Sequence, residues 1–268
     1  MSVLDRDLEI PHARLRWPAL GGPRPILDAG TAQSLVPAPG EVVLVACNLD
    51  WPPEGLTALR RLLSAKEQER AAKFAHAHLR DRWTAGRGLL RVLLGAAAGL
   101  EPVAIKFKYA EHGKPSLAAG PDVRFNVSHS HAVGLYAFSS GREVGVDVEA
   151  IRKRNSDGVA NRFFHANESA ALAKLPDAQR VEAFFGVWCC KEAFIKATGA
   201  GLSQSLSSFE FELGPRGPVR LSWFRDDPQA PGRWTVHLLD PADGVRAALI
   251  AEGEVSRLRC VSLAPSPE

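Results

Sequence analysis

The residues that could do chemistry begin with two carboxylates in the segment 144–149. Valines alternate there with Gly145, Asp147 and Glu149, a period of two that predicts a strand with the valines toward a core and both acids on the other face. Side chains two residues apart on a strand are separated by about 7 Å, so two ionised acids repel by roughly 2 kcal/mol at an effective dielectric of about 20. A cation between them would turn this repulsion into a binding site, whereas a lone D-x-E pattern otherwise indicates a solvated strand face.

A second group of charged residues lies on a predicted helix further along the chain. An apolar stripe follows the helical period at Val181, Phe184, Phe185, Trp188 and Ile195. Lys191 and Glu192 fall inside or at the edge of this stripe, where unpaired charges are costly. Glu192 and Lys196 are also spaced for a surface ion pair, but that pair leaves Lys191 unexplained. A third carboxylate beside the strand pair would supply the hard oxygen ligands that suit Mg²⁺.

The two motifs together resemble those of a known family. G-V-D-V-E at 145–149, followed by W-C-C-K-E-A-F-I-K at 188–196, is similar to the motif pair of the 4′-phosphopantetheinyl transferases of the larger, surfactin-synthetase-activating type. Two further segments agree with it, H-G-K-P at 112–115 and F-N-V-S-H-S at 125–130. The resemblance implies an α+β fold of two similar lobes with pseudo-two-fold symmetry, each a small antiparallel sheet packed with helices.

The resemblance also implies a reaction. It predicts transfer of the 4′-phosphopantetheine group from coenzyme A to a serine of an apo acyl or peptidyl carrier protein, with 3′,5′-ADP as the other product and Mg²⁺ as the cofactor. The metal ligands that it implies are Asp147, Glu149 and Glu192. The lysines that it places at the phosphates are Lys191 and Lys196.

Further site residues follow from the same resemblance. The group that accepts the serine proton stays open between Glu168 and Glu192, and Lys196 is the third catalytic candidate because a lysine there could steady the leaving group. Glu168 would otherwise be an acid favoured by the dipole of its helix. The implied contacts to coenzyme A are Arg70 and Arg82 at the 3′-phosphate, Lys114 and Pro115 in the turn, and Ser128 and His129 at the phosphates.

The composition is that of an ordinary soluble globular protein. The 268 residues are 46% apolar and 24% charged, with a net charge of +3 that does not by itself indicate nucleic acid. Four cysteines without C-x-x-C spacing indicate reduced thiols. With no signal peptide pattern and no membrane-length apolar run, we expect a cytoplasmic monomer that binds neither membrane nor nucleic acid. Nine basic residues against three acids mark the segment 60–91 as basic: Arg60, Arg61, Lys66, Arg70, Lys73, Arg80, Arg82, Arg87 and Arg91.

The order of predicted elements suggests three parts. We expect an irregular arm over 1–40, an N-terminal lobe over 41–141 for the coenzyme A nucleotide, and a C-terminal lobe over 142–268 with the metal and catalytic motifs. Predicted elements include strands at 41–48 and 103–109, a capping box at Ser64 and Glu67, and a helix over 177–198. Another Mg²⁺-dependent transferase or phosphohydrolase, or a basic binding module, are the alternatives; neither a P-loop nor a Rossmann glycine pattern is present.

Overall fold

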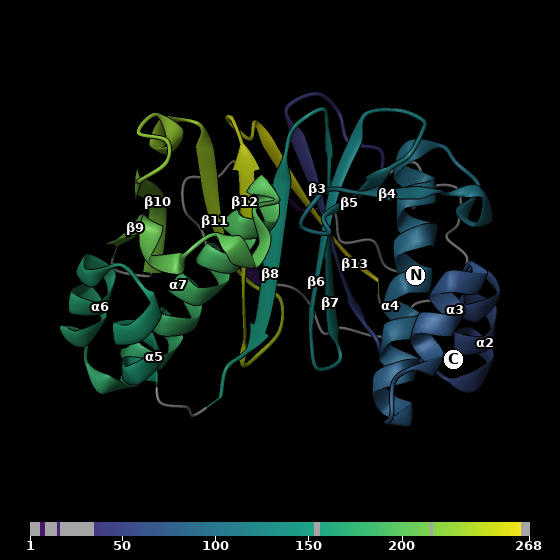
Figure 1. The fold of residues 1–268 in the computed structure, drawn as a ribbon, viewed down its shortest axis with the longest axis horizontal. Coiled ribbons are helices and arrows are strands. Elements are labelled where there is room, and N and C mark those ends of the chain that lie inside the picture. The colour runs from purple at the N-terminus through teal and green to yellow at the C-terminus, as the bar shows by residue number, and fades with distance from the viewer. Residues whose placement is uncertain (1–5, 9–14, 17–34, 153–155, 215–216, 264–268) are drawn as a thin grey trace.

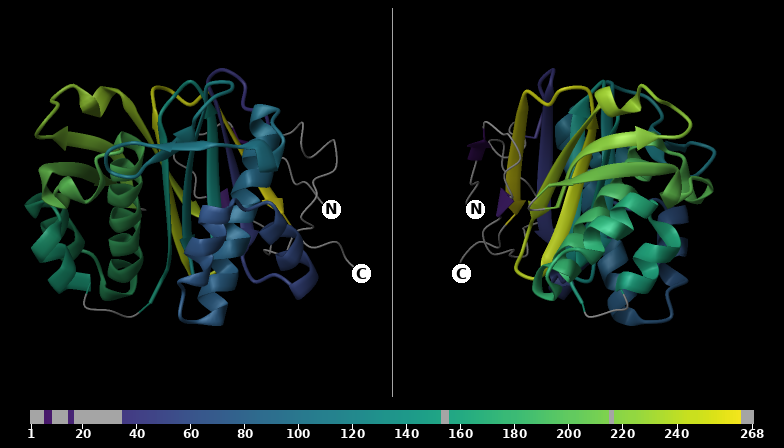
Figure 2. Two further views of the ribbon diagram at one scale, coloured as in Figure 1. Left: turned by 45° about the vertical axis from the view of Figure 1, so that its right-hand side comes forward. Right: turned by 90° about the vertical axis from the view of Figure 1, so that its left-hand side faces the viewer.

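The structure, a computed structural model, describes residues 6–8, 15–16, 35–152, 156–214 and 217–263. Strands occupy the centre and helices lie on both outer sides (Figure 1). One side is covered by α2 (Pro53–Arg61), α3 (Ala65–Ala72) and α4 (Ala77–Ala98), and the other by α5 (Ser156–Phe163), α6 (Ala166–Ala173) and α7 (Asp177–Thr198). Figure 2 shows the same layers from two further directions. No helix among these residues is long and apolar enough to span a membrane.

The first sheet has five strands in the order β1-β13-β3-β7-β6. Their bounds are β1 (Arg6–Leu8), β13 (Arg257–Leu263), β3 (Glu41–Asn48), β7 (Val133–Ser140) and β6 (Val123–Ser130). All neighbours are antiparallel except β13 and β3, which run parallel. The last described strand of the chain therefore lies inside a sheet built mainly from its first half.

The second sheet has four strands in the order β2-β11-β12-β8. These are β2 (Leu15–Arg16), β11 (Trp234–Asp240), β12 (Val245–Glu252) and β8 (Val144–Ala150). Two hairpins complete the strands, β4 (Phe107–Tyr109) with β5 (Pro115–Leu117) and β9 (Phe209–Gly214) with β10 (Gly217–Phe224). Short 3₁₀ helices connect elements at η1 (Pro102–Ala104), η2 (Gly201–Ser203), η3 (Leu206–Ser208) and η4 (Ala230–Gly232).

The two faces of β3 explain the layers. Its side chains alternate, so Val43 and Val45 join a core with α4, whereas Val42 and Leu44 join a core with the second sheet. Because β3 is buried on both faces, its sequence is continuously apolar rather than alternating. The two sheets thus pack against each other and each carries helices on its outer face.

Helix α7 lies very close to β8. A Cβ atom at Gly145 would be only 2.0 Å from the backbone oxygen of Ala193, so only glycine allows this approach. The glycine of the strand motif therefore has a packing role. It lets α7 bring Glu192 and Lys196 near the acids of β8.

Most predicted elements are confirmed. The strand at 41–48 and the helix at 177–198 have the predicted bounds, the Ser64–Glu67 capping box is complete, and the α+β class holds. The strand predicted at 103–109 was wrong at its start, because Pro102 begins the 3₁₀ helix η1 and only Phe107–Tyr109 are extended.

The predicted division of the chain into an arm and two lobes is only partly covered by the described residues. Most of the arm at 1–40 lies outside the described residues, but Arg6–Leu8 and Leu15–Arg16 form strands. The lobe boundary near 141 stays a prediction, and the pairing of β13 with β3 joins the two parts.

Candidate active site

The two acids of β8 share one face of the strand. Asp147 is 5% exposed, and its Oδ1 accepts hydrogen bonds from Lys196 Nζ at 2.6 Å and Ser128 Oγ at 2.9 Å. Its second oxygen, Oδ2, is buried and has no hydrogen-bond partner among the described residues. A buried, unpartnered carboxylate oxygen is rare and points to a missing ligand. A hard cation is the ligand that fits an anionic oxygen.

Glu192 faces the same two acids from α7. Partial burial raises the pKa of Glu192, and the negative charges of Asp147 and Glu149 raise it further, while Lys196 opposes them. The carboxylates of Asp147, Glu149 and Glu192 and the ammonium of Lys196 therefore lie within electrostatic range of one another. This is the electrostatic setting in which a divalent cation would relieve repulsion.

The donor set fits Mg²⁺ in chemistry but is not gathered into a finished shell. No three His, Cys, Asp or Glu side chains in the described parts of the chain converge closely enough to hold a metal ion. Instead Lys196 neutralises Asp147 at 2.6 Å, and Ser130 Oγ donates to Glu149 Oε2 at 3.0 Å. The metal roles of Asp147, Glu149 and Glu192 therefore stay a proposal, supported by the orphaned oxygen of Asp147.

Glu168 and Lys191 form a different unit. Their side chains are 0% exposed and paired at 2.7 Å. Lys191 Nζ also donates to the backbone oxygens of Leu206 and Phe209, both at 2.7 Å.

The carboxylate of Glu168 is equally occupied. It accepts from the backbone N–H groups of His165 and Phe211. Burial raises the pKa of Glu168 and lowers that of Lys191, and the ion pair counteracts both shifts. A lysine that faces the phosphates, or a glutamate that takes a proton from a substrate, does not fit this enclosure. We therefore assign both residues a structural role that joins α6, α7 and β9.

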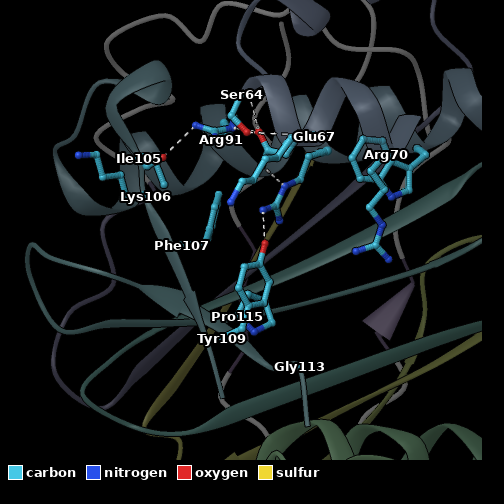
Figure 3. A pocket seen from close by; sticks show the side chains of 13 residues that line it. Ser64, Glu67, Arg70, Arg91, Ile105, Lys106, Phe107, Tyr109, Gly113 and Pro115 are labelled. Carbon is cyan, nitrogen blue, oxygen red and sulfur yellow. Dashed lines mark hydrogen bonds and ion pairs between the residues drawn. The ribbon is translucent and has the colours of Figure 1, made fainter. Parts of the chain in front are cut away.

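A basic, aromatic pocket of about 830 Å³ lies between α3, α4 and the β4–β5 hairpin (Figure 3). Its charged and aromatic lining residues are Lys66, Glu67, Arg70, Trp83, Arg87, Arg91, Lys106, Phe107 and Tyr109. Trp83, Arg87 and Arg91 recur at every fourth position of α4 and so share one helical face. That spacing could have identified Arg87 and Arg91 in the sequence, where only Arg70 and Arg82 were singled out.

The arginines of this region differ in how many hydrogen bonds and ion pairs their guanidinium groups make. Glu67 binds Arg87 at 2.5 Å and Arg91 at 2.8 Å. Arg91 also donates to the backbone oxygens of Pro102, the first residue of η1, and of Ile105, which follows η1. No hydrogen bond or ion pair among the described residues holds the Arg70 guanidinium, which lies over the ring of Trp83 at 5.9 Å. Figure 3 shows Arg70 apart from Glu67 and Arg91.

Arg82 does not line the pocket. Its guanidinium donates two hydrogen bonds to the carboxylate of Asp50, at 2.6 and 2.9 Å. In this structure Arg82 therefore forms an ion pair between α4 and the segment before α2, and its predicted contact with the 3′-phosphate stays a prediction.

A smaller pocket of about 220 Å³ lies between the 112–115 turn and the end of α7, and Lys196 lines it. Gly113 and Pro115 line both pockets, so the two adjoin at the turn. The predicted contact of Pro115 with coenzyme A stays a prediction. The smaller pocket extends from the turn to Lys196.

Lys114 lines the smaller pocket but not the basic pocket. Its Nζ donates to Glu143 Oε2 at 2.5 Å and to the backbone oxygen of Ala197 at 2.6 Å, and burial lowers its pKa although Glu143 opposes this. The ammonium of Lys114 is engaged by these partners, and its predicted contact with coenzyme A stays a prediction. Lys114 ties the turn to the end of α7.

Ser128 and His129 lie on β6 beside Lys196. The buried Ser128 hydroxyl accepts a hydrogen bond from Lys196 Nζ at 2.8 Å. Partial burial, and then the nearby ammonium of Lys196, lower the pKa of His129. A neutral His129 can donate a hydrogen bond to an anion without a charge of its own. The predicted phosphate contacts of both residues stay predictions.

Comparison with known proteins agrees with this site. Residues 143–250 match the 4′-phosphopantetheinyl transferase superfamily, and residues 50–140 match the family described as 4′-phosphopantetheinyl transferase, N-terminal. The chain is 39% identical to the 4′-phosphopantetheinyl transferase HetI of Nostoc sp. over 80% of its own length and 88% of HetI. It is 31% identical to the 4′-phosphopantetheinyl transferase Sfp of Bacillus subtilis over 70% of its own length and 82% of Sfp.

One solved structure is similar over a smaller part. The holo-[acyl-carrier-protein] synthase of Thermotoga maritima matches 42% of this chain and 63% of its own, with 26% identity and a TM-score of 0.32. The sequence relatives cover far more of this chain, and the two family matches span both the basic pocket and the acids of β8 and α7. The chain therefore belongs to the 4′-phosphopantetheinyl transferase superfamily.

Proposed function

We propose that this transferase moves the 4′-phosphopantetheine group of coenzyme A to a serine of an apo acyl or peptidyl carrier protein, and releases 3′,5′-ADP. The observation that carries this proposal is the pair of pockets that adjoin at Gly113 and Pro115. One is a basic pocket of about 830 Å³, and the other is lined by Lys196, which lies beside Asp147 of β8. Coenzyme A has the matching form, a 3′-phosphorylated nucleotide at one end and a pyrophosphate further along.

The basic pocket suits the nucleotide end. Arg70, Lys66 and Lys106 offer positive charge for the 3′-phosphate, whereas Glu67 already occupies Arg87 and Arg91. The rings of Trp83, Phe107 and Tyr109 add flat apolar surface for a base. We assign the 3′-phosphate primarily to Arg70, because its guanidinium can form two parallel hydrogen bonds to phosphate oxygens.

The acids of β8 and α7 suit a metal ion at the other end. Asp147, Glu149 and Glu192 would hold Mg²⁺, which when bound would neutralise the pyrophosphate and polarise its oxygens. The unpartnered Oδ2 of Asp147 supports this placement. Lys196 adds a positive charge to the same place, 2.6 Å from Asp147.

The reaction needs positioning and one proton transfer. The carrier serine Oγ forms a bond to the β-phosphorus, the bond from that phosphorus to the oxygen bridging to the α-phosphate breaks, and 3′,5′-ADP leaves with the electron pair. We assign the serine proton to Glu192. Glu192 lies beside the acids of β8 and Lys196, whereas the carboxylate of Glu168 is enclosed by Lys191 and two backbone amides. Lys196 is placed to offset charge that develops on the phosphate oxygens.

The mass of an apo carrier protein tests this function. We would incubate purified acyl and peptidyl carrier proteins with the enzyme, coenzyme A and Mg²⁺, and record intact masses. We expect a gain equal to one phosphopantetheine group, lost when a chelator is added and lost in Glu192→Gln. Unchanged carriers from several sources, together with calorimetric binding of coenzyme A, would show that the acceptor is something else.

A further inference from the structure

Strands β6 and β8 are joined through side chains instead of a backbone ladder. Each is an edge strand of its own sheet. The backbone N–H groups of Val146, Val148 and Ala150 donate to side-chain oxygens of β6, at 3.0, 3.4 and 3.1 Å. The acceptors are Asn126, Ser128 and Ser130. We call these three residues and the three amides the β6–β8 seam.

The two serines of the seam each hold two groups. Ser128 Oγ accepts from the amide of Val148 and donates to Asp147 at 2.9 Å. Ser130 Oγ accepts from the amide of Ala150 and donates to Glu149 Oε2 at 3.0 Å. Each hydroxyl therefore fixes an acid and the backbone that follows it. A carboxylate held in this way keeps one rotamer, which an exposed acid on a strand would not.

The contact made by Asn126 differs from the two serine contacts of the seam, because no acid precedes the amide that Asn126 binds. Asn126 holds the amide of Val146, but the preceding position is Gly145, which has no side chain to hold. The side-chain amide oxygen of Asn126 is sufficient at this position, because it only has to accept a hydrogen bond from the backbone. Hydroxyls, which accept and donate together, stand only opposite the two acids. The sequence N-x-S-x-S in β6 thus mirrors G-x-D-x-E in β8.

We propose that Ser130 is a positioning residue that orients Glu149 for metal binding, with Ser128 doing the same for Asp147. The proposal rests on the proposed metal site and goes beyond it, because no contact of Ser130 with coenzyme A or carrier is involved. Ser130 is the cleaner test, since Ser128 also touches Lys196. Outer partners that orient metal ligands commonly change metal affinity by about 10-fold to 100-fold when removed.

The experiment compares Ser130→Ala with Ser130→Thr, which keeps the hydroxyl on a strand-compatible side chain. Ser140→Ala, at a similarly half-buried end of neighbouring β7, is the matched control. Mn²⁺ affinity is measured by electron paramagnetic resonance in the absence of carrier. The Mg²⁺ concentration for half-maximal transfer is measured alongside.

We expect Ser130→Ala to weaken Mn²⁺ binding about tenfold and to raise the half-maximal Mg²⁺ concentration equally. Its kcat at saturating Mg²⁺ should stay within about twofold, and Ser130→Thr should restore most of the affinity. A Ser130→Ala variant that matches Ser140→Ala in both metal measurements, while Asp147→Ala loses binding, overturns this inference alone. Normal Mn²⁺ affinity in Asp147→Ala overturns the metal site and the inference with it.

Discussion

Arg70 and Arg82 show how one partner decides what a charged residue can do. Both lie in the same basic segment and look alike in the sequence. Asp50 stands 32 positions before Arg82 and takes its guanidinium, while Arg70 stays open to the basic pocket. A contact of that separation leaves no pattern in the sequence, so the availability of each arginine could only come from the structure.

Arg70→Ala should raise the KM for coenzyme A about tenfold, because one charged hydrogen-bonding partner of the 3′-phosphate is lost. The KM for dephospho-coenzyme A, which lacks that phosphate, should change little. Arg82→Ala is the control and should leave both KM values nearly unchanged. An equal loss with both substrates would place Arg70 away from the 3′-phosphate.

Among the described residues, Asp147 forms its ion pair with Lys196 alone. In Lys196→Met the largely buried Asp147 loses this partner, so we expect a lower melting temperature without metal. Mg²⁺ should raise the melting temperature of this variant more than that of the wild-type protein, because a bound cation would replace the missing charge. Equal shifts in both proteins would argue against a cation at Asp147. Thermal unfolding with and without Mg²⁺ provides the measurement.

At the scale of elements, Glu67 connects α3 to α4. Its carboxylate caps α3 through the amide of Ser64 at 2.7 Å and binds Arg87 and Arg91 of α4. Burial alone would raise the pKa of Glu67, but the Ser64 amide and both arginines outweigh it, and the pKa is lowered from 4.5. The carboxylate of Glu67 thus fixes Arg87 and Arg91, two residues that line the basic pocket.

This shift predicts a dependence of stability on pH. A lowered folded-state pKa gives stability that is fully present above the unfolded value and is lost as pH falls through the folded value. Glu67→Gln should therefore reduce the free energy of unfolding by about 1–3 kcal/mol at pH 7. The difference from wild type should shrink below pH 4.5. Urea unfolding across pH would show it, and a difference independent of pH would contradict it.

The Glu168–Lys191 pair connects α6, α7 and β9 in the core. Lys191→Met leaves Glu168 buried without its cation and should cost about 3–5 kcal/mol. Adding Glu168→Gln should recover a large part of that loss. Breaking the exposed Arg220–Glu212 pair of the β9–β10 hairpin should cost less than about 1 kcal/mol. A similar cost for both pairs in urea unfolding would contradict the structural role.

Strongly periodic elements were the most predictable level. The alternation in 144–149 and the apolar stripe of 181–195 identified β8 and α7, because each pattern matches the period of its element. Lys196 pairs with Asp147, and Glu192 lies within electrostatic range of both acids of β8, but the three acids do not converge into a metal shell among the described residues. The sequence could not show which lysine is enclosed, since Lys191 and Lys196 lie on one helix and differ only in what packs on them. Strand β13 was missed, because its partner β3 lies at the other end of the chain.

At the scale of the molecule, Lys114 links the 112–115 turn of the N-terminal part of the chain to residues of the C-terminal part. It reaches from the 112–115 turn to Glu143 before β8 and to the backbone of Ala197 in α7. Glu143 in turn accepts from Arg124 of β6 at 2.7 Å. The turn that separates the two pockets is thereby fixed relative to the catalytic helix.

Lys114→Met should lower the free energy of unfolding by about 1.5–3 kcal/mol, because it removes charged hydrogen bonds from a mostly buried site. Glu143→Gln should produce part of the same loss. A direct contact with the nucleotide would instead raise the KM for coenzyme A and leave stability unchanged. Denaturant unfolding and steady-state kinetics on both variants separate these outcomes.

The position of β13 has a consequence for how the protein is made. Arg259 of β13 pairs with Glu41 of β3 across 218 positions of sequence, so β3 leaves the ribosome long before its parallel neighbour has been translated. Until then one edge of an apolar strand lacks its partner, a condition that invites pairing with other nascent chains. Contacts of such long separation also slow folding. The first sheet can close only after nearly the whole chain has been synthesised.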